Sequence, residues 1–533
     1  MAIFARNPCD LPVCRRGGPQ FGTVQAGTWV LVAAIAGSSM GSIDGTAVNV
    51  ALPLVQRDLH ADAAGLQWIV EGYSLFLSAL ILVGGSLGDR FGRRAIFLLG
   101  IVIFALSSLA CGLAPTIEFL NAARCVQGIG AALSIPGSLA LISATFSGEE
   151  RGRAIGTWSG FSAITTALGP VLGGWLAQTI SWRAVFFINL PLAALVVAVS
   201  LFGVPESRDE EAPKRIDVIG ACLATTGLGA LVYGLIGLQG VAMNSWFAWV
   251  TALGCALLLA FVLYERFGTA HPMLRSDLFQ SRPFAGANLY TLLLYAALGG
   301  ALYFLPFNLI NVQGYTPVAA GASFLPFILI MFVASRWSGG LVDRIGARTP
   351  LVVGAVLAAA GFFAFARTGI GASYWMSFFP AAVILGLGGA FFVAPLTTTA
   401  MDAVAVSQAG IASGINNAVS RAAGLIAIAG LGLALAGSFD GVLQREVTGL
   451  HISPPVVAAL ARQRNTILSG HVSENAIPPA ERAVVTTAIR DAYVAGFRTT
   501  MLIAAGLSLL AAIIAWFWDW NSRSPRGGPS GRC

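Results

Sequence analysis

Charged residues are scarce in this chain, and lysine is almost absent. Only 10% of the 533 residues are charged, whereas soluble globular domains contain about 25% because their surfaces must meet water. The single lysine, Lys214, follows Pro213, so the Gly-Lys-Ser/Thr end of a phosphate-binding loop cannot form. An ion gradient or a separate ATPase must therefore supply any energy that the protein uses.

Metal-binding and disulfide patterns are also missing. The seven cysteines lie in the leader, within apolar runs and at the C-terminus, and the four histidines pair neither with each other nor with cysteine at ligand spacing. No histidine is followed by Asp at the spacing of membrane acyltransferases, so a polytopic membrane enzyme is only a remote alternative. We expect no enzyme activity, no metal and no cofactor.

The excess of positive charge does not indicate a nucleic acid partner. The net charge is +7, but the arginines are scattered over short loops. A nucleic-acid-binding protein gathers its basic residues on one wetted face. We therefore expect no nucleic acid partner.

Long apolar runs fill most of the chain. About 20 apolar residues cross the hydrocarbon core of a bilayer as a helix. The first six predicted spans lie near residues 28–53, 67–86, 95–114, 118–144, 155–178 and 184–204. Two more follow a charged break, near 218–239 and 246–264, and the last six lie near 284–311, 317–340, 349–367, 376–400, 408–436 and 495–518. The sequence predicts an all-α integral membrane protein with fourteen transmembrane helices.

The spans divide the chain into two six-helix bundles and an inserted pair of helices. We expect a cytoplasmic leader at 1–27, an N-terminal bundle at 28–204, cytoplasmic linkers with the inserted helices at 205–283, a C-terminal bundle at 284–518 including an extracytoplasmic loop at 437–494, and a cytoplasmic tail at 519–533. Arginines concentrate on the side of both termini, so the positive-inside rule places that side in the cytoplasm. The expected location is the cell inner (plasma) membrane.

One loop sequence occurs twice, once in each predicted bundle. The copies read GSLGDRFGRR at 85–94 and GGLVDRIGAR at 339–348. Their shared glycines allow close helix packing, and the Asp and Arg residues can pair at a helix end near the headgroups. Two copies at corresponding positions indicate an internal duplication, as in alternating-access carriers. The candidate gating residues are Gly85, Asp89, Arg90, Gly92, Arg93 and Arg94, and in the second copy Gly339, Asp343, Arg344, Gly346 and Arg348.

With this loop the chain resembles the major facilitator superfamily over nearly all of residues 28–518. The stretch DGTAVNVALP at 44–53 and the inserted helix pair are similar to the fourteen-helix drug:proton antiporter branch, as are Trp68, Tyr73, Trp182, Arg183, Phe186, Asn189 and Pro191. The resemblance implies the major facilitator fold and proton-coupled export of drugs or amphipathic small molecules by alternating access. The implied partners are a lipophilic or cationic small-molecule substrate, protons and the lipid bilayer, and the expected state is a monomer. The alternative is a dedicated exporter of one native metabolite, such as an antibiotic or siderophore.

Two acidic residues within the predicted spans are candidates for proton coupling. A mid-span carboxylate costs on the order of 2.5 to 3.5 kcal/mol, so Asp44 needs a compensating role. It either faces an aqueous cavity and exchanges protons, which a low-dielectric environment makes feasible near neutral pH, or it is a structural hydrogen-bonding group. Glu71, about one turn into the second span, either faces the same cavity or lies wetted at the interface.

Arg124 is a third candidate, in the fourth predicted span. Gln127, Gly128 and Gly130 follow it at a spacing that matches the superfamily's motif in this helix. Its guanidinium either polarises a neighbouring acid and helps to move protons, or reaches along the helix to the nearer interface.

Two further groups of residues lie in the fifth and thirteenth predicted spans. Gly169, Pro170, Gly173 and Gly174 form an intramembrane Gly-Pro break that suits a hinge or a tight helix interface, and the resemblance implies that this pattern marks exporters. Asn416, Asn417 and Arg421 either line the cavity or form an interhelical hydrogen-bond cluster.

Overall fold

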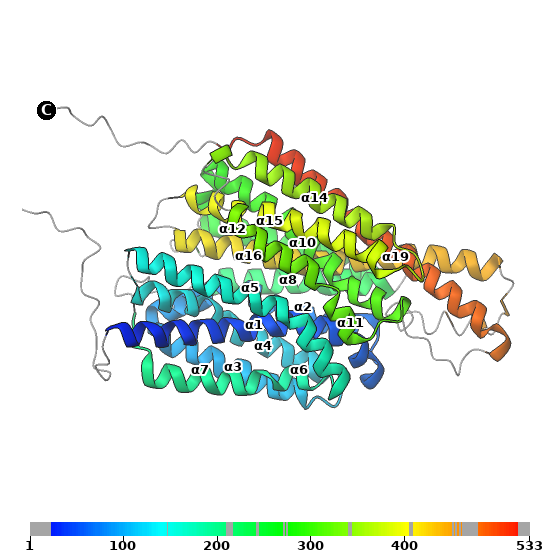
Figure 1. Cartoon of the computed structure of the whole chain (residues 1–533), viewed down its shortest axis with the longest axis horizontal. Helices are drawn as coiled ribbons and strands as arrows, with labels where there is room; N and C mark the ends of the chain where they lie inside the picture. The colour runs from blue at the N-terminus through cyan, green and yellow to red at the C-terminus, as the bar shows by residue number, and fades with distance from the viewer. Residues whose placement is uncertain are drawn as a thin grey trace, which may run out of the picture.

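The computed structural model describes residues 23–146, 148–208, 217–240, 245–269, 272, 276–338, 344–404, 409–449, 452–453, 456–457, 460 and 478–520. All regular elements in these ranges are helices (Figure 1). The all-α prediction is therefore confirmed for the part of the chain that the structure describes.

The helices fall into three groups along the chain. The first group is α1 (Thr23–Leu59), α2 (Ala63–Phe91), α3 (Arg93–Gly112), α4 (Ile117–Thr145), α5 (Gly148–Thr179), α6 (Ala184–Phe187) and α7 (Asn189–Gly203). The second is α8 (Val218–Gly240), α9 (Ser245–Leu263) and the π-helix η2 (Tyr264–Gly268). The third is η3 (Ser276–Gln280), α10 (Arg282–Phe307), η4 (Asn308–Val312), α11 (Pro317–Ala322), α12 (Leu325–Ser338), α14 (Arg348–Ala366), η5 (Tyr374–Phe378), α15 (Phe379–Asp402), α16 (Ala409–Gly449) and α19 (Pro479–Phe517).

Local sequence explains where several helices begin. Asp62 caps α2, accepting from the backbone N–H of Gly65 at 2.8 Å. Thr116 caps α4 in the same way, and Thr316 caps α11 directly before Pro317. Such side chains satisfy backbone donors that have no partner within the helix.

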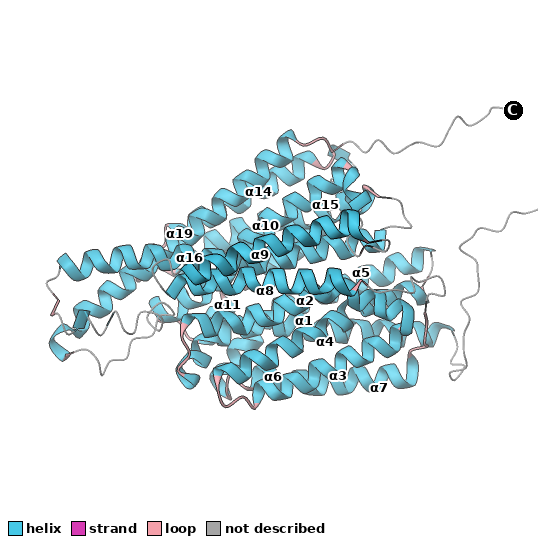
Figure 2. Ribbon diagram, turned by 180° about the vertical axis from the view of Figure 1, so that it is seen from behind, coloured by secondary structure: helices cyan, strands magenta, loops and turns pink. Residues whose placement is uncertain are grey.

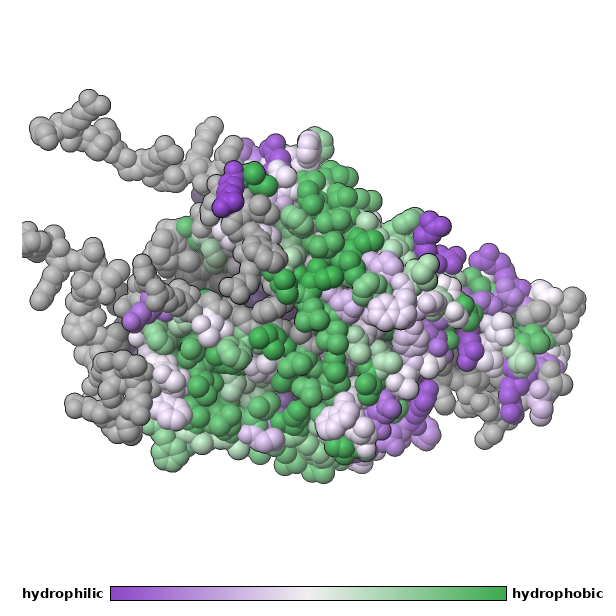
Figure 3. Space-filling model, viewed as in Figure 1, coloured by the Kyte–Doolittle hydropathy of each residue, from purple (hydrophilic) through white to green (hydrophobic). Residues whose placement is uncertain are grey.

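Twelve of the described helical segments are long and apolar enough to cross a membrane. Figure 3 shows hydrophobic residues covering the middle of the visible face, with hydrophilic residues gathered where α16 and α19 protrude. The predicted spans near 155–178 and 317–340 coincide with α5 and with the pair α11 and α12. These helices pack among the others, since α5 lies against α1 and α11, and α12 lies against α15.

The first and third groups each form a bundle, and the second group lies between them. In the first bundle α4 packs between α2 and α3, while α1 packs against α5 and α7. In the second, α10 packs against α16 and α19, and α14 against α15 and α19. Helix α8 contacts α2 of one bundle and α16 of the other, whereas α9 packs mainly on α8 (Figure 2).

Helices α16 and α19 are longer than the predicted spans near 408–436 and 495–518. They continue past the ends of their neighbours as a protruding pair (Figures 1 and 2). The hydroxyls of Ser438 and Thr499 join the two helices at 2.8 Å. The segment expected as loop 437–494 therefore contains helix at both of its ends. We call this end of the molecule the hairpin end, and the opposite end the termini end.

Glycines bring neighbouring helices into backbone contact. A methyl group on Gly84 of α2 would overlap the carbonyl oxygen of Ala132 in α4. Gly100 of α3 and Gly130 of α4 face each other in the same manner, as do Gly354 of α14 and Gly388 of α15. Helices in a membrane gain from such close packing because lipid offers no hydrophobic driving force between them.

Replacement of Gly84 by alanine should therefore loosen the contact between α2 and α4. We expect Gly84→Ala to destabilise the purified protein by about 1 to 3 kcal/mol, because the added methyl meets backbone that cannot move aside. The matched control is Gly430→Ala in α16, where no described atom beyond the adjoining turns of the helix lies within 4 Å of the added group. Thermal unfolding in detergent measures both variants; an equal melting temperature for Gly84→Ala and wild type would contradict the packing argument.

Candidate functional site

A carboxylate and a guanidinium meet in the interior of the first bundle. Asp44 of α1 is 0% exposed and Arg124 of α4 is 1% exposed. Nη1 of Arg124 donates to Oδ2 of Asp44 at 2.5 Å. Two charges removed from water in this way need good geometry and further hydrogen bonds.

Those further hydrogen bonds come from three helices. Nε2 of Gln127 and Nδ2 of Asn189 both donate to Oδ1 of Asp44, at 3.1 and 3.2 Å. Nη1 of Arg124 also donates to Oε1 of Gln127 at 2.6 Å, and its Nε donates to the carbonyl of Ile69 at 2.8 Å. The carboxylate therefore accepts hydrogen bonds from three side chains.

Ser108 of α3 completes this cluster. Its Oγ accepts from Asn189 at 2.9 Å and from Gln127 at 3.3 Å, and it donates to the carbonyl of Phe186 at 2.9 Å. Asp44, Ser108, Arg124, Gln127 and Asn189 are all buried, and they connect α1, α3, α4 and α7. We refer to these five residues as the charge cluster.

Aromatic rings cover the guanidinium of Arg124. Its Cζ lies 4.4 Å from the ring centre of Tyr73 and 5.8 Å from that of Phe186. Cation–π contacts of this kind gain strength when the cation is desolvated. The side chain therefore does not reach an interface, and of the two interpretations of Arg124 the structure shows the pairing with a neighbouring acid.

Glu71 of α2 does not join the charge cluster. Its side chain is fully buried, and neither Oε1 nor Oε2 has a hydrogen-bond partner among the residues that the structure describes. Burial by protein excludes the wetted position that was the alternative for this residue. The hydroxyl group of Tyr303 in α10 is close enough to interact electrostatically with the carboxyl group of Glu71. A charged carboxylate without donors is strongly disfavoured in such surroundings, so we infer that Glu71 is neutral in this conformation.

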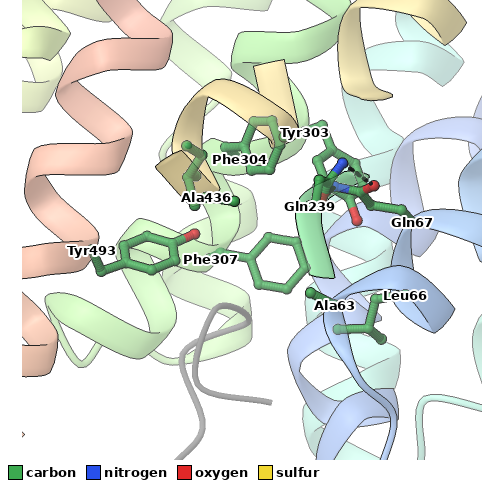
Figure 4. A pocket seen from close by; sticks show the side chains of 11 residues that line it. Ala63, Leu66, Gln67, Gln239, Tyr303, Phe304, Phe307, Ala436 and Tyr493 are labelled. Atoms are coloured by element: carbon green, nitrogen blue, oxygen red, sulfur yellow. Dashed lines mark hydrogen bonds between the residues drawn. The ribbon is translucent and has the colours of Figure 1, made fainter. Parts of the chain in front are cut away.

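One turn from Glu71, toward the hairpin end, a pocket lies between the two bundles (Figure 4). Its polar wall is Gln67 of α2 and Gln239 of α8, whose amides exchange two hydrogen bonds at 3.1 and 3.0 Å. Gln239 also donates to the carbonyl of Ala429 in α16 at 3.1 Å. Tyr303, Phe304, Phe307 and Tyr493 form its aromatic wall. One buried glutamine therefore joins α8 to both bundles.

The first copy of the duplicated loop lies between α2 and α3, at the termini end. Arg93 pairs with Asp89 at 2.8 Å, and Nη1 of Arg94 donates to the carbonyl of Val204 at 2.9 Å. Gly92 ends α2 with φ of 117°, a value that favours glycine. Arg90 lies over the ring of Phe91, and Gly85 faces Pro136 of α4.

The second copy of the loop is described only in part. Gly339 and Asp343 lie outside the described residues. Gly346 has φ of 76° and occupies the same motif position as Gly92. Arg344 is exposed, and Arg348 donates to the carbonyl of Trp518 at 3.4 Å. The two loops therefore share a glycine with positive φ at equivalent positions.

The Gly-Pro motif of α5 contacts both bundles. A methyl on Gly169 would overlap Thr46 of α1, and one on Gly173 would lie 2.5 Å from the carbonyl oxygen of Ala47. On the other side of α5, Gly174 faces the carbonyl of Pro317 in the second bundle.

A second backbone contact joins the same pair of helices. The carbonyl of Pro170 in α5 faces Gly321 of α11. The motif therefore packs α5 against α1, close to Asp44, and also against α11.

The three candidates in α16 lie in different environments. Asn416 donates to Thr291 and Asn288 of α10 at 2.8 and 3.3 Å, so it belongs to an interhelical hydrogen-bond cluster. Asn417 is exposed and Arg421 is half-buried. Both lie within a segment apolar enough to span a membrane.

Sequence reasoning did not identify Ser108, the Tyr73 ring over Arg124, or Gln67 and Gln239 as members of sites. A polar side chain inside an apolar run is the available signal for Ser108 and the two glutamines. The aromatic contact depends on the register of α2 against α4, for which the sequence carries no local signal.

Comparison with known proteins gives the same picture of the fold. The profile of the Major Facilitator Superfamily matches residues 33–428. The multidrug resistance protein Stp of Mycobacterium tuberculosis (strain CDC 1551 / Oshkosh) is 36% identical over 509 residues, covering 92% of this chain and 91% of Stp. The tetracenomycin C resistance and export protein of Streptomyces glaucescens is 33% identical over 509 residues, covering 91% of this chain and 90% of that protein.

A solved structure agrees at the level of the fold. The crystal structure of a bacterial homolog to the human lysosomal transporter Spinster, in an inward-facing and unoccupied conformation, superimposes with a TM-score of 0.61. It has 17% sequence identity and covers 92% of this chain and 98% of that chain. Together with the profile match and the relatives above, these findings show that the chain belongs to the major facilitator superfamily of membrane transporters.

Proposed function

We propose that this protein is a proton-coupled antiporter that exports drugs or other amphipathic small molecules across a bacterial cytoplasmic membrane. The observation that carries the proposal is the charge cluster, in which Asp44 and Arg124 are paired inside the first bundle. An ionisable pair in a membrane interior is expensive and is typically found where protons or substrates move. The relatives Stp and the tetracenomycin C protein are named for multidrug resistance and for resistance and export, which supports the same class of activity.

The proposed architecture has fourteen membrane helices. Twelve described helices meet the length and hydropathy of a span, and we assign α5 and the pair α11 and α12 as the remaining two because they pack within the bundles. Helices α8 and α9 are then the pair inserted between two six-helix bundles, with boundaries near residues 205 and 283. The hairpin end faces outward and both termini lie in the cytoplasm, following the arginine bias.

Protonation of Asp44 is the proposed switch. In its ionised form the carboxylate holds Arg124, Gln127 and Asn189 through three hydrogen bonds. A proton on the carboxyl removes the charge that attracts the guanidinium, so the four connected helices lose their strongest common contact.

Helix α5 links this switch to the second bundle. Thr46 and Ala47, which follow Asp44 within one turn of α1, contact Gly169 and Gly173. On its other side α5 contacts α11 through Gly174. A shift of α1 is therefore transmitted through backbone contacts that have no side chain to absorb it. Separation of α5 from α11 would open the hairpin end.

The cycle follows from these contacts by alternating access. In the outward-open state the carboxyl takes a proton and substrate leaves; in the inward-open state it releases the proton as substrate binds. Exchange is obligatory when substrate and proton favour different states of the site. We propose that Glu71 takes part as a second proton-exchanging group, and that the loop around Asp89 and the corresponding second copy gate the termini end. The transporter is proposed to act as a monomer.

A second candidate function within transport is the dedicated export of one native metabolite. The names of several relatives, including the puromycin resistance protein of Streptomyces alboniger, refer to single antibiotics. A substrate panel that yields a single transported compound would favour this alternative.

Removal of the charge at Asp44 should abolish coupling. We expect Asp44→Asn to lose ethidium efflux driven by a pH gradient in proteoliposomes, down to the level of empty vesicles. This variant leaves Arg124 without its counter-charge, which costs about 3 to 5 kcal/mol. The double variant Asp44→Asn, Arg124→Gln removes both charges and should recover part of that stability without recovering efflux.

The control for this experiment is Asp58→Asn, at the end of the same helix. Asp58 forms an ion pair with Arg183 on the protein surface, which contributes at most about 1 kcal/mol. It should retain pH-driven efflux. Unchanged efflux in the folded Asp44 variants would contradict the coupling role of this residue.

Replacement of Glu71 by glutamine tests its proposed part in proton exchange. Glutamine keeps nearly the shape of the neutral acid but cannot release a proton, so we expect Glu71→Gln to fold normally and to exchange fewer protons for each drug molecule. Simultaneous measurement of proton and ethidium flux in proteoliposomes gives this ratio, with Glu481→Gln of α19 as the control. An unchanged ratio would assign Glu71 a structural role only.

A further inference from the structure

Arg421 of α16 is a half-buried cation for which the described residues provide no counter-charge. Its Nε is buried and has no hydrogen-bond acceptor, and Arg421 forms no ion pair with any residue in the described ranges. A guanidinium stays charged at every physiological pH. An unpaired charge at this depth costs on the order of 2.5 to 3.5 kcal/mol.

The acidic residues of the interior do not neutralise it. Asp44 is occupied by Arg124 at 2.5 Å. Both carboxyl oxygens of Glu71 are without partners, so Glu71 does not pair with Arg421 in this conformation. With the charge cluster neutral and Glu71 protonated, Arg421 leaves one uncompensated positive charge between the bundles.

The position of Arg421 makes it accessible from the interface between the bundles. Gly414, Asn417 and Arg421 follow one another at three- and four-residue spacing, which places them on one face of α16. A methyl group added at Gly414 would lie 3.2 Å from Leu82 of α2, so this face is directed toward the first bundle. Asn417 is exposed although it lies within a membrane-spanning segment. An exposed amide at that depth indicates contact with water rather than lipid.

Two tyrosines lie near Arg421. Tyr73 of α2 and Tyr295 of α10 are close enough to interact electrostatically with its guanidinium. Tyr73 also stacks on Arg124, with its ring centre 4.4 Å from Cζ. A ligand held at Arg421 would therefore lie beside the residue that covers the charge cluster.

We propose that Arg421 binds the oxyanion of an amphipathic, aromatic substrate: a carboxylate, phenolate or enolate. The planar guanidinium offers parallel N–H donors that match such a group, and one side-on contact would satisfy the unpartnered Nε. The proposal rests on the proposed export function and extends its substrates from lipophilic cations to acids and zwitterions.

A matched pair of dyes tests this site. Rhodamine 110 carries a free carboxylate, and rhodamine 123 is its methyl ester. Fluorescence anisotropy gives the binding constant of each dye for the full-length protein in detergent. We expect Arg421→Gln to weaken rhodamine 110 binding by about tenfold, the loss typical of a charged hydrogen bond, and to leave rhodamine 123 binding within about twofold. Arg421→Lys should give an intermediate loss of rhodamine 110 affinity, because lysine keeps the charge but lacks the parallel N–H donors of the guanidinium.

The control is Arg445→Gln, on the protruding part of the same helix, where Nε donates to the carbonyl of Gly441. It should bind both dyes as wild type does. Equal losses for both dyes in Arg421→Gln would overturn the proposal and indicate a structural role. The proposal would also be overturned if Arg421→Gln bound each dye as tightly as wild type does. It would likewise be overturned if wild type bound neither dye. Efflux of ethidium driven by a pH gradient is measured in the same variants, so that failure of the export function is seen separately.

Discussion

The pairing of Asp44 with Arg124 is the interaction on which the first bundle depends. Both side chains are withdrawn from water and lipid alike, so every polar atom of the pair must be satisfied from within the protein. The hydrogen bonds come from Gln127 of α4 and Asn189 of α7, and Ser108 of α3 bonds to Gln127 in turn. An added proton changes the charge of this centre and therefore the interactions of four helices together.

Close backbone contact is the second constraint. Helix α5 has glycines where it meets its neighbours: Gly169 and Gly173 face α1, and Gly174 faces α11. Contacts of this kind slide or separate as units because there is no flexible side chain to absorb a displacement. At the hairpin end the second link between the bundles is polar, since Gln239 of α8 bonds to Gln67 and to the carbonyl of Ala429. Opening at this end must break both links.

Much of the fold could be predicted because the bilayer imposes simple rules on sequence. Apolar runs of span length marked the helices, and the repeated loop marked two related bundles, in which Gly92 and Gly346 both have a positive φ. The predicted spans end at residue 436 and begin at residue 495, whereas α16 continues to Gly449 and α19 begins at Pro479. Polar stretches can continue a helix that projects from the membrane, and hydropathy alone does not detect them.

The candidate site could be predicted in its charges but not in its pairings. Asp44 and Arg124 were identifiable because ionisable residues in apolar runs are rare. Their contact joins residues that are 80 positions apart, and it depends on how α1 and α4 cross. The full burial of Glu71 likewise depends on packing between helices from different bundles. Ser108 resembles any other small polar residue until the structure places it between Gln127 and Asn189.

Proton release on substrate binding tests the central claim most directly. Purified protein in weakly buffered detergent solution is mixed with ethidium, and a pH-sensitive dye reports the protons that appear. If Asp44 exchanges its proton for substrate, wild type releases protons in proportion to bound ethidium, and the double variant Asp44→Asn, Arg124→Gln binds ethidium with a smaller release. Equal proton release from wild type and the double variant, or ethidium binding by wild type without any release, would contradict the account.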